Sequence, residues 1–124
     1  MSSLTARRRA YVAIQVTLTG GVDHLIDIVN TILAAESGMP TPPMVCPDAC
    51  GHLILQNDPG NTTAHVIEIG DGLALNSGTK RYGYQLAVGA AQSYTSGNLN
   101  VIQFGSMYGI GANGDKLNIE VMTY

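Results

Sequence analysis

The chain has 124 residues, enough for one domain with a sizeable hydrophobic core but not for two. Charged residues make up only 12% of it and the net charge is -3, which disfavours nucleic acid as a partner because no basic surface can offset phosphate charge. No stretch approaches the roughly 20 apolar residues of a membrane-spanning helix, and two cysteines are too few for a disulfide framework. We therefore expect a cytosolic product outside membranes, with part of its charge-poor surface against another protein.

Residues 1–9 are predicted to form a flexible arm. Arg7, Arg8 and Arg9 supply half of the six basic residues of the chain. Such a cluster can clamp carboxylates on a partner protein, contact nucleic acid or remain solvated. The overall charge argues against nucleic acid, so a solvated arm and a contact with a protein partner remain.

A strand and a helix follow the arm. Over residues 11–19 apolar side chains alternate with small or polar ones, which predicts a half-buried strand that ends at Gly20 and Gly21. Residues 22–36 place their apolar side chains at the three- and four-residue spacing of one helical face, which predicts a helix over this range. Aspartates near its start suit the helix dipole, and a glycine and a proline just beyond it supply a stop.

Residues 38–51, GMPTPPMVCPDACG, hold four of the five prolines and are predicted to form a stiff loop. Both cysteines lie at its end, in CPDACGH. Zn²⁺ needs about four ligands, usually as two separated pairs, whereas Cys46 and Cys50 form a single pair with His52 beside it. A redox pair is normally Cys-x-x-Cys at a helix start, and this spacing does not fit. We interpret both residues as structural loop cysteines, with a metal site or a short local disulfide as the alternatives.

From residue 52 onward, short apolar runs alternate with turn residues at regular spacing. The runs are HLILQN, AHVIEIG, LALN, RYGYQLAVG, QSYTSGNLNVIQFG, SMYGIG and KLNIEVMTY. In the last run Leu117, Ile119 and Val121 are expected to face inward. This pattern predicts a single, mainly β domain over residues 1–124, an antiparallel β-sandwich or jelly roll with one short helix near the N-terminus.

No motif in the sequence predicts a reactive centre. GIGANG at residues 109–114 matches G-x-G-x-x-G but lacks the following helix, so we interpret its glycines as turn residues, with Asn113-Gly114 suited to a tight hairpin. His24 is expected on the polar side of the helix and His65 at the start of a strand, in surface or core roles. Aspartates beside glycines, among them Asp115, are expected in turns. We expect no catalytic residues, no metal and no cofactor, and a protein that is not an enzyme.

Five elements follow one another in residues 52–124. They are a strand ending in Gln/Asn at residues 53–57, an I-x-I-G strand at 66–70, an apolar-x-G-A turn within 86–91, L-N-V-I-Q-F at 99–104 and G-x-x-G-D-K-L-x-I-x-V at 111–121. This order resembles that of small β-sandwich virion proteins of tailed bacteriophages. The arm, the first strand, the helix and the proline-rich loop are not part of the resemblance.

The resemblance implies a capsid decoration or cement protein that binds the outer surface of the major capsid shell and stabilises it. It would be made in the bacterial cytoplasm and would sit on the virion exterior, as a homo-oligomer such as a trimer or as bridging copies, without catalytic residues. The candidate contacts with the major capsid protein are Arg7, Arg8 and Arg9 of the arm and Pro42 and Pro43 of the loop. The alternatives are a tail, head-fibre or head–tail joining component and, from a different class, a carbohydrate-binding β-domain whose tyrosines stack on sugars.

Overall fold

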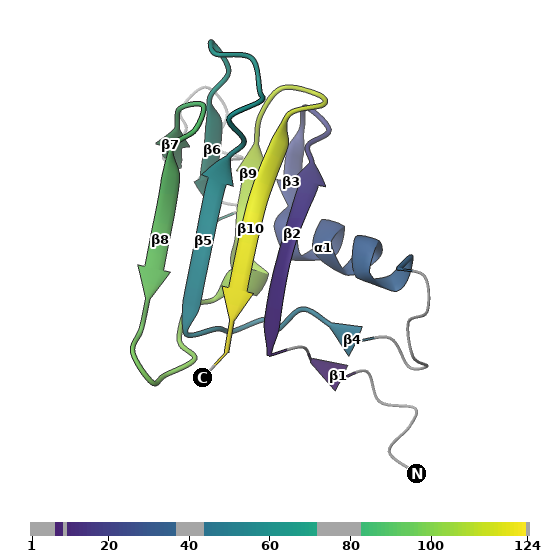
Figure 1. Ribbon diagram of the computed structural model, residues 1–124, viewed down its shortest axis with the longest axis vertical. Helices are drawn as coiled ribbons and strands as arrows, with labels where there is room; N and C mark the ends of the chain where they lie inside the picture. Colours follow the sequence, from purple (N-terminus) through teal and green to yellow (C-terminus); the bar gives the residue numbers. More distant parts are fainter. Residues whose placement is uncertain (1–6, 9, 37–43, 72–82, 124) are drawn as a thin grey trace.

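The computed structural model describes residues 7–8, 10–36, 44–71 and 83–123, and its body consists of two four-stranded antiparallel sheets (Figure 1). The β2 sheet has the strand order β2 (Tyr11–Thr17), β10 (Lys116–Met122), β5 (His52–Asn57) and β8 (Ala91–Thr95). The β3 sheet has the order β3 (Val22–His24), β9 (Tyr108–Ile110), β6 (Ile67–Gly70) and β7 (Tyr84–Leu86). The predicted β-sandwich is confirmed.

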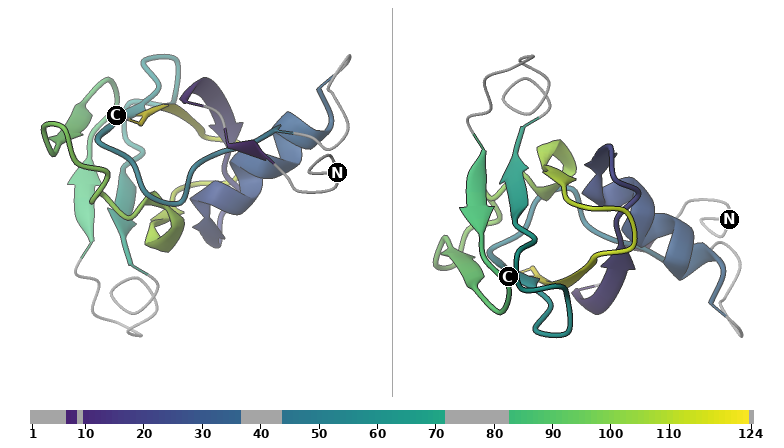
Figure 2. Two further views of the ribbon diagram at one scale, coloured as in Figure 1. Left: turned by 90° about the horizontal axis from the view of Figure 1, so that it is seen from below. Right: turned by 90° about the horizontal axis from the view of Figure 1, so that it is seen from above.

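The strand order follows from a chain that folds back on itself as one long hairpin. β2 pairs with β10, β3 with β9, β5 with β8, and β6 with β7, all antiparallel. Two further antiparallel ladders, between β5 and β10 and between β6 and β9, join the four pairs into two sheets. Eight strands wound in this way form a jelly roll, and Figure 2 shows its two sheets from both ends. The more specific of the two predicted architectures is therefore the one observed.

The core lies between the sheets and is built by strands of period two. Leu117, Ile119 and Val121 of β10 are buried, as predicted, and the register sets Ile119 opposite Leu55 and Val121 opposite Leu53 of β5. Burying one such side chain contributes about 1.5–3 kcal/mol. A slip of one residue would turn every inward side chain to the other face, so the alternation fixes the register as well as the fold.

The helix is shorter than predicted. Helix α1 spans Leu25–Ala34, whereas Val22–His24, expected in its first turn, form β3 and pair with β9. The spacing of apolar residues could not distinguish a first helical turn from a short strand, because a residue at either end of a helical pattern also fits a strand. Pairing with β9 gives these three residues backbone hydrogen bonds that the first turn of a helix lacks. The helix itself buries Leu25, Ile26, Val29 and Leu33 of the predicted apolar face, whereas Ile32 of that face is 37% exposed.

The arm and the proline-rich loop are not wholly irregular. Arg7–Arg8 form strand β1, which pairs in parallel with strand β4 (Met44–Val45). The predictions of a fully flexible arm and of a loop without strands are therefore both wrong. A two-residue edge ladder needs only a few backbone bonds, which a proline-rich segment can still supply beyond its prolines. Arg9, Pro42 and Pro43 lie outside the described residues.

Two expectations for the C-terminal runs need correction. The Asn113-Gly114 turn exists, with φ of +92° at Gly114 and the Asp115 N–H bonded to Ala112 O at 3.0 Å. It does not close a hairpin, because β9 and β10 belong to different sheets. A Cβ on Gly111, just before this turn, would lie 2.8 Å from Leu18, so the crossing between sheets requires glycine there.

The run QSYTSGNLNVIQFG is not one strand. It forms β8, then an irregular connection in which Ile102 makes an isolated bridge to Cys50, and then the short 3₁₀ helix η1 (Phe104–Ser106). Leu99 and Val101 on this connection are 61% and 57% exposed. The run LALN lies outside the described residues.

Candidate functional site

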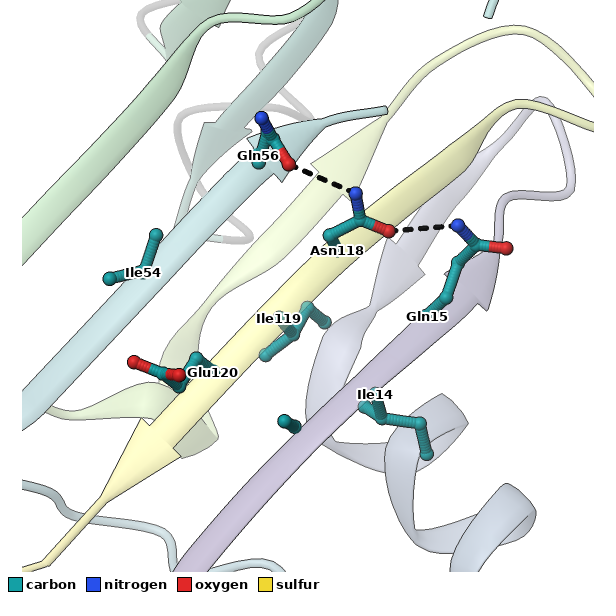
Figure 3. Close-up of a pocket in the computed structure, with 8 residues that line it drawn as sticks. Ile14, Gln15, Ile54, Gln56, Asn118, Ile119 and Glu120 are labelled. Atoms are coloured by element: carbon teal, nitrogen blue, oxygen red, sulfur yellow. Dashed lines mark hydrogen bonds between the residues drawn. The ribbon is translucent and has the colours of Figure 1, made fainter. Parts of the chain in front are cut away.

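The outer face of the β2 sheet carries a row of three amide side chains. The register places Gln15 of β2, Asn118 of β10 and Gln56 of β5 side by side. Gln15 Nε2 donates to Asn118 Oδ1 at 2.9 Å, and Asn118 Nδ2 donates to Gln56 Oε1 at 3.0 Å (Figure 3). Asp58 Oδ1 accepts from Gln15 at 3.3 Å and from Asn118 at 2.9 Å, and so fixes both amides. We refer to these three amides as the amide row.

A carboxylate held from two sides, that of Glu120, lies on β10 two residues after Asn118 of the amide row. Glu120 Oε2 accepts from the Tyr11 hydroxyl at 2.8 Å, and Glu120 Oε1 lies 3.1 Å from His52 Nε2. The hydrogen bond to Glu120 is the main reason why the pKa of Tyr11 is raised, with smaller contributions from burial and from the charge of Glu120. Tyr11, Glu120 and His52 are called the Glu120 clamp below.

A groove of about 410 Å³ crosses the three strands between the amide row and the row that holds Tyr11 and His52. Its middle row consists of Ala13, Glu120 and Ile54, which the register places opposite one another. Ala13 is short, and Glu120 is engaged by Tyr11 and His52, which leaves the space open. The groove is lined by Ala13, Ile14, Gln15, Ile54, Gln56, Asn118, Ile119 and Glu120.

A second groove, of about 510 Å³, lies between β2 and the C-terminal half of α1. Its lining is apolar except for Glu36. The residues are Val12, Ala13, Ile14, Ile32, Leu33, Ala35 and Glu36.

The two cysteines are buried and not bonded to each other. Burial, followed by the charges of Cys50 and Asp48, raises the pKa of Cys46 to about 12, and burial also raises the pKa of Cys50. A thiol with so high a pKa is neither a nucleophile nor a ready metal ligand at neutral pH. Within residues 7–8, 10–36, 44–71 and 83–123, no group of three or more His, Cys, Asp or Glu side chains could hold a metal ion. The absence of bound metal stays a prediction, which elemental analysis of the purified protein tests.

Each of the three histidines lies beside a carboxylate. His24 is 2.8 Å from Asp27, His52 is in the Glu120 clamp, and His65 Nδ1 is 3.0 Å from Asp115 Oδ1. His24 ends β3 rather than lying on the helix, and its ring stacks on Tyr108 with 4.5 Å between centroids. His65 lies in a turn before β6, not at the start of the strand. Because Glu120 and Asp115 are at least 50 positions away from their histidines, no local motif signals these pairs.

The contacts of His24 predict that the stability of the folded protein depends on pH. Its Nε2 lies 2.6 Å from Gly105 O and its Nδ1 2.8 Å from Asp27, so both ring nitrogens face acceptors. The bond to Gly105, with help from Asp27 and Asp48, raises the pKa of His24 above its ordinary 6.5, although burial opposes this. Because the folded-state pKa is the higher one, the stabilisation is complete below the unfolded-state value and is lost as pH rises through the folded-state pKa.

We expect urea unfolding to show this loss as a fall in the free energy of unfolding when the pH is raised from below 6.5 through the folded-state pKa of His24. The comparison is with His24→Asn, which leaves every other side chain of the chain unchanged. An equal change of unfolding free energy in both proteins would contradict the prediction.

The structure brings together two of the segments expected to contact a partner. Strand β1 holds Arg7 and Arg8, and its partner β4 directly follows the proline pair of the loop. The β1–β4 ladder and the connection from β8 to β9 lie at the same end of the sandwich, the lower end in Figure 1. The sequence indicated the arm and the loop, but not the groove, whose walls come from three strands distant in sequence.

Fold and site together define a jelly-roll domain with a polar groove on one outer sheet face. No protein-family model, no curated protein and no solved structure matches the chain. None of the helices described is long and apolar enough to cross a membrane.

Proposed function

We propose that this chain is a structural protein of a tailed-bacteriophage virion that decorates the outer surface of the major capsid shell and stabilises it. The observation that carries the proposal is the jelly-roll topology, an architecture from which viral capsid domains are built. Six of the eight strands, β5 to β10, come from residues 52–124, which resemble small phage virion proteins.

The lower end of the sandwich in Figure 1 is the proposed capsid contact. Leu99 and Val101 expose most of their apolar surface there, on the connection after β8. Strand β1, with Arg7 and Arg8, lies at the same end. Exposed apolar residues and arginines are both enriched in protein–protein interfaces.

The stabilising mechanism would be physical. Each copy buries a modest area against two or more capsid subunits, as a trimer at a junction or as single bridging copies, and the weak contacts add through multivalency. The aliphatic and amide groups of this charge-poor chain lose little on desolvation compared with charged side chains.

The proposal is tested by adding purified protein to phage particles that lack it. We expect saturable binding in high, symmetry-related copy number and a higher temperature of capsid disruption. Val101→Asp should reduce binding at least about tenfold, because a charge would be buried in the apolar contact. Val66→Asp is the matched control, since Val66 is 44% exposed and precedes β6, at the opposite end of the sandwich.

Copy number separates the proposal from its nearest alternative. A few copies confined to the tail or to the head–tail junction would favour the tail, head-fibre or joining role. Equal binding of the Val101→Asp and Val66→Asp variants would exclude the lower end as the contact.

A further inference from the structure

We propose that the groove across the outer face of the β2 sheet is a binding site for a neutral saccharide. Its volume of about 410 Å³ falls within the range of about 300–1,000 Å³ typical of small-molecule sites. It lies on the sheet face, whereas the proposed capsid contact is at the lower end, so both surfaces could be occupied together.

The groove matches the amphipathic character of a sugar ring. Ala13 and Ile54 give it apolar surface in the middle row, against which the C–H groups of a sugar can pack. The amide row on one side provides donors and acceptors for hydroxyl groups, and Glu120 in the middle row provides an acceptor. Tyr11, half exposed and on the same face of β2 as Ala13, adds an aromatic surface beside the groove.

The walls are ordered without a ligand. Gln15, Asn118 and Gln56 hold one another in place, and Tyr11 and His52 hold Glu120. Binding to side chains that are already fixed costs little conformational entropy.

Bonding capacity nevertheless remains on these walls. In the part of the chain that the structure describes, Gln15 Oε1 has no hydrogen-bond partner, and Gln56 Nε2 makes one bond, to Gly89 O at 3.4 Å, with its second hydrogen free. Each oxygen of Glu120 accepts a single bond, so each has a lone pair left. A hydroxyl group, which both donates and accepts, can use an acceptor and a donor of this kind at once.

Charge selects a neutral ligand. The carboxylates near the groove are Glu120 and Asp58, and donors already surround both: Tyr11 and His52 for Glu120, and Gln15, Asn118 and the Gly60 N–H for Asp58. An acidic sugar or a phosphate would be repelled by these carboxylates, and a basic peptide would give up hydration for carboxylate oxygens that already accept hydrogen bonds. Amides dominate the walls, and amides favour uncharged polar ligands.

The test uses the full chain on an array of neutral and acidic oligosaccharides, followed by calorimetric titration of the hits. We expect saturable binding of neutral members. Ala13→Phe should abolish it, because the ring would fill the groove at an exposed strand position that tolerates aromatic residues. Ala64→Phe makes the same change at an exposed position in the loop before β6, outside the groove, and should bind as the unaltered protein does.

Gln15→Met is the second variant, because it removes the unpartnered oxygen, together with the exposed Nε2 bonds to Asn118 and Asp58, without filling the groove. It should weaken binding about tenfold and leave the unfolding midpoint nearly unchanged. The proposal is overturned if no neutral oligosaccharide binds, if Ala13→Phe folds and still binds, or if a lysine-rich peptide rather than a sugar occupies the groove. None of these results bears on capsid binding, which Val101→Asp tests separately.

Discussion

Replacing Asn57 with leucine is expected to lower the free energy of unfolding by about 2–4 kcal/mol. Asn57 ends β5 with its side chain fully buried between the sheets. Its Nδ2 donates to Leu86 O of β7 at 2.9 Å and to His65 O at 3.3 Å, and its Oδ1 accepts from Asn61 at 2.7 Å. One amide therefore ties the β2 sheet to the β3 sheet.

Leucine fills a similar volume but removes the side-chain donor to the Leu86 and His65 carbonyls and one of the two acceptors of Asn61 Nδ2, which still donates to Lys116 O. The buried carbonyl of Leu86 loses its side-chain donor, and an unsatisfied buried group costs about 1–3 kcal/mol. The backbone of Asn57 keeps its bonds to Gly89 and Ala90, so the change acts through the side chain alone. Asn57→Asp, which keeps the acceptor but removes both donors, should cost at least as much.

Urea unfolding followed by circular dichroism measures this effect. Asn98→Leu is the matched control, because Asn98 is exposed in the turn after β8, and its replacement should change stability by no more than about 0.5 kcal/mol. If Asn57→Leu unfolds at the urea concentration of the control, the polar link between the sheets contributes nothing to stability.

The sequence predicted the features of the fold that depend on local pattern. Alternation in β2, β5 and β10 gave the correct inward faces, and the three- and four-residue spacing gave the buried face of α1. The sequence pattern could not distinguish the start of the helix from a separate short strand, because Val22–His24 become β3 only through pairing with β9, more than 80 positions away. The Asn113-Gly114 turn shows the same limit, since turn chemistry does not say which sheet the next strand joins.

The candidate groove depends even more on distant contacts. Gln15, Gln56 and Asn118 are ordinary polar residues on the solvent side of three strands, and only the register of β2, β10 and β5 places them side by side. Asn57 is similar: in sequence it is a polar residue at the end of an apolar run, and its inter-sheet role requires Leu86 of β7. Local patterns report which face is buried, but not which polar groups meet across strands.

Replacing Phe104 with alanine is expected to destabilise the fold by about 3–5 kcal/mol, with a lowering of the melting temperature of about 10–20 °C. Phe104 is the only phenylalanine of the chain and is fully buried in η1. The cost combines lost apolar burial with a cavity that the surrounding strands cannot easily fill. Phe104→Leu, which retains most of the volume, should cost markedly less.

The position of η1 gives this substitution a second, local effect. The Gly105 N–H donates to Asp48 O at 2.9 Å, and Gly105 O lies 2.6 Å from His24 Nε2, so η1 connects the cysteine-containing loop to the start of α1. Loss of Phe104 should loosen this connection and expose Cys46 and Cys50, which are at most 2% exposed in the native fold.

Thiol labelling with a disulfide reagent under native conditions measures that exposure. Cys46 and Cys50 should react slowly in the unaltered protein, because burial both hinders access and keeps the thiols protonated. Phe104→Ala should label at least about tenfold faster, since a loss of about 3 kcal/mol raises the open population more than a hundredfold if opening is global. Tyr84→Ala is the control: it removes an aromatic ring that is 55% exposed, and should change neither the melting temperature nor labelling appreciably. Rapid labelling of both cysteines in the unaltered protein would show that the η1 contacts do not close the loop, and the role assigned to Phe104 would fail.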